Sequence, residues 1–181
     1  TAPAQTPLVI PTGLAQKEGN SRAWVPGKFA PARAQFIYSA GVMPTPPLQI
    51  RQIALRRDGL TNIGFIDHQV EVELWMSALK PPPLVGYSNY WADNRGKYWG
   101  QVATKKKIRF PADYKPLVPP APFSVVLILD KPYYYLGKGL LVEWRLHAPT
   151  NENSEWYVDA EADLSWRGWP SGPDTTYVGT H

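Results

Sequence analysis

The segment Asp159-Ala-Glu-Ala-Asp163 carries the carboxylates whose spacing most suggests chemistry. In an extended strand alternate side chains share a face and lie roughly 6 to 7 Å apart, so Asp159, Glu161 and Asp163 would point the same way. Three carboxylates on one face repel one another unless a cation balances them. An arginine (Arg145 or Arg167), a lysine or solvent is the favoured partner, and a calcium ion bound by oxygen ligands is the alternative. Calcium is therefore the one cofactor that the sequence suggests.

Residue patterns typical of catalysis are absent from the sequence. It has no Gly-x-Ser-x-Gly elbow, no His-Glu-x-x-His helix and no phosphate-binding loop. Glu71 and Glu73 fall on the same side of a predicted strand, but that side is the exposed one, where solvated charge is the ordinary interpretation. We therefore predict that the protein is not an enzyme. A polysaccharide-active jelly-roll enzyme, which would need two carboxyl groups facing each other across a cleft, is the less favoured alternative.

The sequence is rich in aromatic residues, with 8 tryptophans and 10 tyrosines among 181 residues. Four tryptophans fall in or beside predicted loops: Trp91, Trp99, Trp166 and Trp169. Exposed rings at such places could stack on sugars or bury into a neighbouring subunit, because both uses need a large apolar body with a polar rim. Packing at the ends of the core is the competing interpretation. These four residues form the predicted carbohydrate-stacking platform.

The composition excludes several classes of protein. Without cysteine there is no disulfide framework, thiolate zinc site or thiol nucleophile, and 20 prolines disfavour long helices. The net charge is only +4, and the single tight basic cluster, Lys105-Lys106-Lys107, is interpreted as a solvated turn. Nucleic acid is therefore not a predicted partner. Because no run approaches about 18 apolar residues, no membrane span is predicted either.

Alternating and continuous apolar runs predict an all-β fold. The clearest period of two places Val70, Val72, Leu74 and Met76 on an inward face. Phe123–Leu129 and Leu140–Leu146, joined through Gly137-Lys138-Gly139, predict neighbouring antiparallel strands at the centre of a sheet. Other strands are predicted at 33–39, 48–57, 69–77, 99–104, 106–110, 155–164 and 175–178, the tail after Trp166 being otherwise loop. The pattern indicates a two-sheet antiparallel β-sandwich of jelly-roll or lectin-like type.

Residues 1–31 are rich in proline and glycine and predict an extended N-terminal arm before a single sandwich domain at 32–181. Within the arm only Leu8, Val9 and Ile10 resemble a strand, and we expect them to serve assembly by adding to a neighbour's open sheet edge. The chain begins Thr1-Ala-Pro-Ala, as a protein does after removal of a signal peptide. We therefore expect an extracellular or cell-surface location.

Several short blocks, in this order, resemble a family of exported bacterial β-sandwich proteins of unassigned function, common in planctomycetes and in organisms with PEP-CTERM sorting tails. The blocks are Glu18-Gly19-Asn20, Arg33-Ala-Gln-Phe-Ile-Tyr38, Ile50 to Gly59, Val70-Glu-Val-Glu-Leu74, Asp93-Asn-Arg-Gly96, Pro132-Tyr-Tyr-Tyr135 and Gly139-Leu-Leu-Val142. The resemblance implies an exported lectin-like or jelly-roll fold and transfers no catalytic residues. Family members often end in an apolar sorting helix, whereas this chain stops at His181. We expect a removed tail or a released protein.

Two functions follow from these features. The proline-rich arm, the low charge and the aromatic loops favour a secreted structural protein that packs with copies of itself into a filament, sheath or layer. The alternative is a carbohydrate-binding module, with or without calcium, whose partner is a polysaccharide. Sandwich folds serve both purposes, so fold alone does not choose between them.

Overall fold

The computed structural model describes residues 7–10, 13–25, 32–59, 66–80, 88, 90–112, 118–147, 156–160 and 165–170. Over these residues the chain forms nine strands and one short 3-10 helix, η1 (Trp91–Asn94), and no α-helix. The strands are β1 (Ser21–Val25), β2 (Ala32–Tyr38), β3 (Leu48–Arg56), β4 (His68–Ala78), β5 (Gly100–Phe110), β6 (Phe123–Tyr135), β7 (Leu140–Leu146), β8 (Trp156–Ala160) and β9 (Ser165–Pro170). The predicted all-β class is confirmed. No helix in the described ranges is long and apolar enough to cross a membrane.

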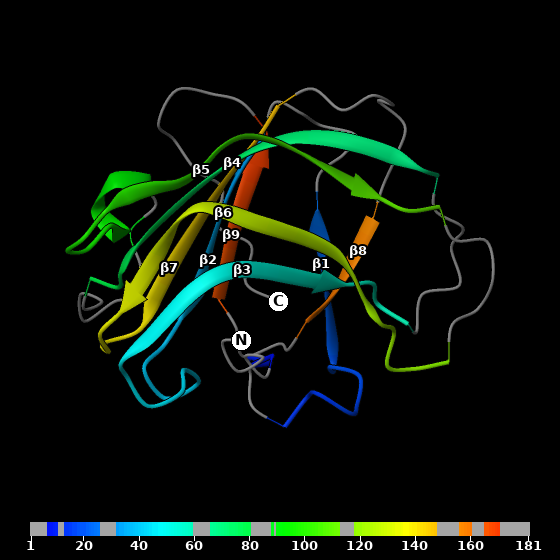
Figure 1. The fold of residues 1–181 in the computed structure, drawn as a ribbon, viewed down its shortest axis with the longest axis horizontal. Coiled ribbons are helices and arrows are strands. Elements are labelled where there is room, and N and C mark those ends of the chain that lie inside the picture. Colours follow the sequence, from blue (N-terminus) through cyan, green and yellow to red (C-terminus); the bar gives the residue numbers. More distant parts are fainter. Residues whose placement is uncertain are drawn as a thin grey trace, which may run out of the picture.

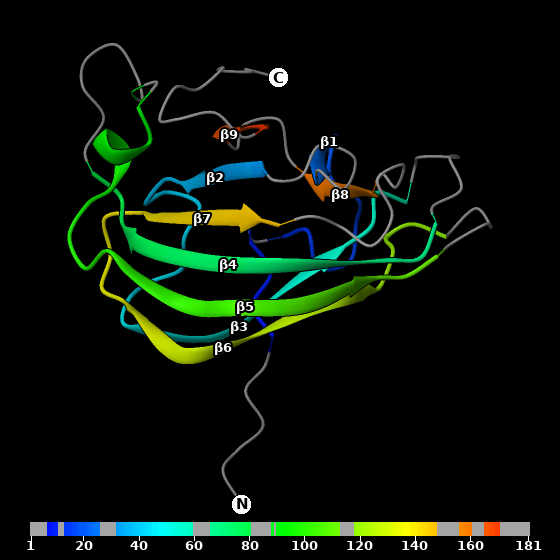
Figure 2. The same cartoon turned by 90° about the horizontal axis from the view of Figure 1, so that it is seen from above.

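The strands form three antiparallel sheets arranged in two layers. The largest has the order β5-β4-β7-β2-β9, a second pairs β3 with β6, and a third pairs β1 with β8. In Figure 1 the β3–β6 sheet lies in front of β7, β2 and β9, and the view from above in Figure 2 shows β3 and β6 at one side of the molecule and β9 at the other, with β5 next to β3 and β6. The antiparallel sandwich expected from the sequence is thereby confirmed.

The core lies between these layers and follows the predicted period of two. On β4 the side chains of Val70, Val72, Leu74 and Met76 are all at most 1% exposed. From the opposite layer β6 contributes Val125, Leu127 and Leu129 to the same buried cluster. The alternate residues of both strands consequently point outward, which gives each sheet an outer face.

The predicted central hairpin is wrong, because β6 and β7 belong to different sheets. β7 is buried on both faces and lies between β4 and β2, whereas β6 alternates between buried and exposed residues and pairs with β3. The turn between them carries positive φ angles at Gly137, Lys138 and Gly139. A Cβ on Gly139 would lie 2.7 Å from the carbonyl oxygen of Tyr38, so this turn requires glycine there. This turn carries the chain from the layer of β6 to the layer of β7.

The basic cluster at 105–107 is not a turn, and the strands predicted at 99–104 and 106–110 are one strand, β5. Lys105 has a φ of 45°, and the β4–β5 register shifts between Val72 and Leu74, as in a β-bulge. At this place Asp130 of β6 forms an ion pair with Lys106 and accepts a hydrogen bond of 2.8 Å from the Thr104 amide. The bulge thus turns β5 toward β6, where the two sheets meet.

Both chain ends contain a strand that the sequence did not reveal. β1 lies inside the predicted arm and pairs with β8, and β9 lies in the tail predicted as loop and pairs with β2. The segment at residues 8–10 is not a strand. Ile10 packs against the main core of its own chain, while Leu8 is exposed. β1 and β9 are short, and glycine and proline interrupt or bound them. Their own residues therefore give little sign of a strand, and only the pairing with distant strands shows that they are strands. The strand predicted at 175–178 lies outside the described residues.

Candidate functional site

The outer face of the five-stranded sheet carries an unusual set of charged, amide and aromatic side chains. It arises because the polar residues of β2, β4 and β7 alternate with the core residues of the same strands. The strand register aligns them in two rows across the sheet. The first row is Trp75, Glu143 and Gln35, and the second is Glu73, Arg145 and Arg33.

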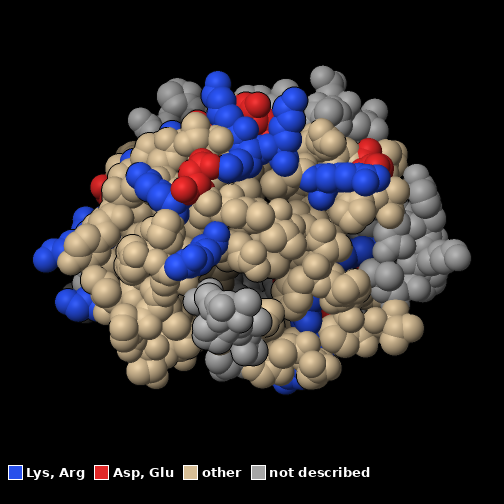
Figure 3. All heavy atoms as spheres, in the orientation of Figure 1, with Lys and Arg blue, Asp and Glu red and all other residues tan. Residues whose placement is uncertain are grey.

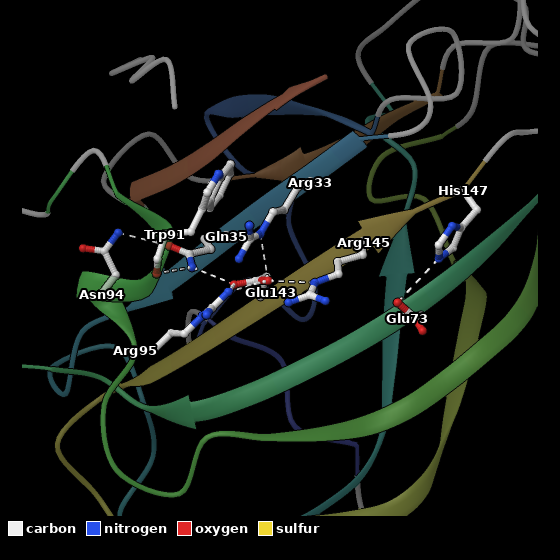
Figure 4. Close-up of polar contacts among 9 residues, drawn as sticks. All are labelled: Arg33, Gln35, Glu73, Trp91, Asn94, Arg95, Glu143, Arg145 and His147. Carbon is white, nitrogen blue, oxygen red and sulfur yellow. Dashed lines mark hydrogen bonds and ion pairs between the residues drawn. The ribbon is translucent and has the colours of Figure 1, made fainter. Parts of the chain in front are cut away.

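Glu143 is the centre of this face and is fully buried (Figure 4). Its carboxylate accepts hydrogen bonds from Arg33 Nε at 2.8 Å and from Gln35 Nε2 at 2.8 Å. Arg145 Nε donates to it at 3.1 Å, and Arg95 Nη2 donates at 3.2 Å. Three guanidinium groups therefore surround one carboxylate. We call these five residues the Glu143 cluster.

Burial and these hydrogen-bonding partners have opposite effects on the pKa of Glu143. Burial alone would raise the pKa, but the hydrogen bonds from Arg33 and Gln35 and the charges of Arg33 and Arg95 outweigh burial and lower it below the ordinary 4.5. Glu143 consequently stays ionised at neutral pH. It is suited to fixing cations in place and poorly suited to donating a proton.

We expect this ionisation to make stability depend on pH. Because the folded-state pKa of Glu143 is lower than the unfolded value, its contribution is present above about pH 4.5 and is lost as pH falls through the folded pKa. The difference in urea midpoint between the natural protein and Glu143→Gln should therefore be largest near neutral pH and shrink below about pH 4. Glu18 and Asp159, whose pKa values burial raises, act with the opposite sign in both proteins and cancel from the difference. A difference that does not change with pH would contradict this expectation.

The segment from Tyr90 to Trp99 folds over one end of this face and supplies Arg95. The amide of Gln35 donates to the carbonyl of Trp91 at 3.0 Å and accepts from Asn94 Nδ2 at 3.1 Å. Both Gln35 and Asn94 are buried, so these bonds lock η1 onto β2. Gly96 then passes close to β4, where its amide donates to Ser77 Oγ at 3.2 Å.

Gly96→Ala is expected to disturb this segment, because the new Cβ would overlap the backbone carbonyl oxygen of Ala78. We expect a loss of about 1–3 kcal/mol in the free energy of unfolding, as in other overpacked sites. Gly100→Ala is the matched control, since its Cβ would meet nothing closer than 3.9 Å. Urea denaturation of both variants checks the prediction. Equal stability of the two would show that the segment adjusts freely.

Each arginine of the cluster also lies over a tryptophan ring. The guanidinium carbons lie 4.8 Å (Arg33 over Trp91), 4.2 Å (Arg95 over Trp99) and 4.7 Å (Arg145 over Trp75) from the ring centroids. Trp75 and Trp99 stack with centroids 5.2 Å apart. Such cation–π contacts, together with the Glu143 carboxylate, hold the guanidinium planes in fixed orientations.

The predicted tryptophan platform is distributed differently from the expectation. Trp91 is buried, at 4% exposure, and Trp99 is half-buried beneath Arg95, so Trp91 offers no open ring for stacking. Trp166 and Trp169 lie in β9, where the register pairs them with Phe36 and Arg33 of β2. The structure thus brings Trp91 and Trp99 to the outer face as supports for arginines.

Glu143 was missed because it stands inside an apolar run that was interpreted as core, and Arg145 of the same run was considered only as a partner of the carboxylates at 159–163. The available signal was their charge. Glu-Trp-Arg inside Leu140–Leu146 places two ionisable residues in a strand too apolar to lie at the surface, and a buried charge requires partners. Trp75, on the polar face of β4 beside Glu73, was a second sign of the same face.

Of the predicted metal ligands only Asp159 is described, since Glu161 and Asp163 lie outside the described residues. Asp159 forms an ion pair with Arg56, whose Nε donates to it at 2.6 Å, and accepts a bond of 2.8 Å from the Gly19 amide. Among the described side chains its cationic partner is therefore Arg56, while Arg145, one of the arginines expected from the sequence, contacts Glu143 instead. The side chain of Arg167 lies outside the described part of the structure. Within the described residues no three His, Asp or Glu side chains gather as metal ligands would.

Arg56 is also the point where the N-terminal segment is fastened to the sandwich. It is 4% exposed, and besides Asp159 it donates to the carbonyls of Leu14 at 2.9 Å and Lys17 at 2.6 Å. Next to it Glu18 accepts a bond of 2.6 Å from the Gly59 amide. Two blocks of the family resemblance, at 18–20 and 50–59, therefore meet here. We call Arg56, Asp159 and the backbone they hold the Arg56 clamp.

The outer face of the β3–β6 sheet is of a different kind. Val126, Ile128 and Tyr134 of β6 point outward, and Ile128 is 65% exposed. In Figure 3, which looks onto this side, Lys, Arg, Asp and Glu gather mainly along the upper rim, and basic side chains also lie to the left and right of the largely uncharged middle. Val126 and Ile128 are alternate residues of β6, so their exposed side chains are neighbours on this face.

Comparisons with protein-family models, with curated proteins and with solved structures find no match for this chain. The family resemblance therefore stays a prediction, and the geometry of the two outer faces supplies the support for a function.

Proposed function

We propose that the protein is an exported, non-enzymatic carbohydrate-binding protein with a lectin-like jelly-roll fold, and that it binds polysaccharide on the outer face of its five-stranded sheet. The observation that carries this proposal is the Glu143 cluster. It fixes guanidinium donors on a sheet face with tryptophan rings beneath them.

This arrangement meets a main requirement of sugar recognition. Hydroxyl and acidic groups of a sugar need donors and acceptors at defined positions, and a face built on strands holds them more rigidly than loops do. The tryptophan rings contribute by holding these donors in fixed orientations, because Trp75 and Trp99 stack on each other and carry Arg145 and Arg95 on their other faces. Because the lowered pKa keeps Glu143 ionised, the cluster serves binding rather than acid catalysis.

Binding to a panel of soluble polysaccharides by affinity electrophoresis tests the proposal. We expect Trp99→Ala to weaken binding, because Trp99 supports both Arg95 and Trp75. Tyr134→Ala, an aromatic truncation on the opposite face, is the matched control and should leave binding unchanged. Thermal melts establish that both variants are folded. The absence of binding to every polysaccharide, or loss of binding only in Tyr134→Ala, would overturn the proposal.

A second candidate function is self-assembly into a filament, sheath or layer, favoured by the apolar outer face of β6. The partner is a second copy of this chain, since a largely uncharged surface is well covered by another of the same kind (Figure 3). Light scattering at increasing concentration tests it. Ile128→Lys should abolish association because it places a charge in the contact, and a natural protein that stays monomeric would exclude it.

A further inference from the structure

We infer that the ligand of this face is an acidic polysaccharide, whose carboxylate or sulfate group is bound by Arg145 at the Glu143 cluster. The inference rests on the proposed function and specifies its ligand class. It follows from the charge balance of the face, the exposure of the arginines and the geometry of the guanidinium group.

On the described part of this face three guanidinium groups and two carboxylates, Glu71 and Glu73, reach solvent, so positive charge is in slight excess there. Three guanidinium groups surround Glu143, whose side chain has no exposed area, while those of Arg33, Arg95 and Arg145 are 20%, 21% and 35% exposed. The other carboxylate of the rows is Glu73, which is 18% exposed, accepts a bond from Gln101 and lies 3.5 Å from His147. The atoms nearest solvent are therefore mainly arginine donors.

Arg145 is the donor best placed to receive an anion. Its Nε donates a hydrogen bond to Glu143, and its guanidinium group lies over the ring of Trp75. The two terminal nitrogens of this group have no hydrogen-bond partner within the described part of the chain. A guanidinium fork held in this way matches the two oxygens of a carboxylate or sulfate. Because Glu143 and Trp75 already fix its orientation, binding costs little side-chain entropy.

The compactness of the cluster favours an acidic sugar over a nucleic acid. All three arginines contact one carboxylate, so their charges gather at a single point. Nucleic-acid binding draws its affinity from many phosphate contacts spread along a backbone, which such a patch does not provide. One acidic group with a neutral ring around it fits both the charge and the aromatic surroundings.

Pairs of polymers that share a backbone and differ in charge test this inference. The pairs are dextran sulfate with dextran, and polygalacturonate with methyl-esterified pectin, titrated by calorimetry. We expect the natural protein to bind at least one acidic member, with affinity falling as salt rises from about 50 to 300 mM. Arg145→Gln should weaken that binding by about tenfold or more, as expected for one lost charge-assisted fork, and Arg145→Lys by less.

Arg109→Gln is the matched control, because Arg109 is an exposed arginine on β5 paired with Asp67, outside the cluster. It should bind like the natural protein. Equal binding of neutral and acidic members would overturn the inference while the proposed function stands, and binding of no polymer would overturn both. Equally tight binding of poly-dT, or an equal loss in Arg109→Gln and Arg145→Gln, would show a nonspecific polyanion surface and overturn the inference.

Discussion

Glu143→Gln is expected to lower the free energy of unfolding by about 3 kcal/mol, the lower end of the range for breaking a buried ion pair. The carboxylate is fully buried and balances three guanidinium groups, which would face one another without it. The loss stays at the lower end because the arginines are partly exposed and can turn to water. For a domain of this size the melting temperature should fall by about 6–12 °C.

Urea denaturation at neutral pH measures this effect, and Glu73→Gln is the matched control. Glu73 lies on the same face but has only Gln101 and a more distant His147 as partners. We expect its loss to stay below about 1 kcal/mol. A double-mutant cycle between Glu143→Gln and Arg145→Gln should show coupling. Additive losses, or equal losses in the two glutamate variants, would contradict the central position given to Glu143.

Arg56→Met is expected to cost about 3–5 kcal/mol, because it leaves Asp159 buried without its cation and two backbone carbonyls without their donor. Arg56→Lys should restore only part of this loss, since an ammonium group cannot reproduce the fork that reaches three partners. The comparison with Arg109→Met, whose ion pair is exposed, separates a buried clamp from a surface pair.

Hydrogen exchange distinguishes the local from the global effect of this change. In Arg56→Met the amide of Gly19, which donates to Asp159, should exchange faster than the amides of β4. The N-terminal segment would then open without unfolding of the sandwich. If Gly19 keeps its protection and stability is unchanged, the clamp does not hold this segment.

The parts of the fold that were predicted correctly are those with local causes. The alternation of Val70, Val72, Leu74 and Met76 follows from the pleat of a single strand, and it fixed the core face of β4. The residues of a strand do not by themselves determine which other strand it pairs with. β6 and β7 are adjacent in sequence but pair with β3 and with β2 and β4, and nothing in their own composition specifies those distant partners.

The same distinction between local causes and distant partners explains why the candidate site was not predicted from the sequence. Arg33, Gln35, Arg95 and Glu143 come from three separate stretches, and only the order β4-β7-β2 and the folding back of η1 bring them together. Asp159 shows the converse. The sequence predicted a cation beside Asp159, but Arg56, 103 residues away, could not be identified as that cation without the fold.

The pairing of the two chain ends has a consequence for biosynthesis. Ser21 of β1 faces Ala160 of β8, and Ala32 of β2 faces Pro170 of β9. At about 5–20 residues per second, the first strands leave the ribosome on the order of ten seconds before their partners exist. The sandwich therefore closes only after residues 156–170 have been made, and until then the early strands stay without their partners.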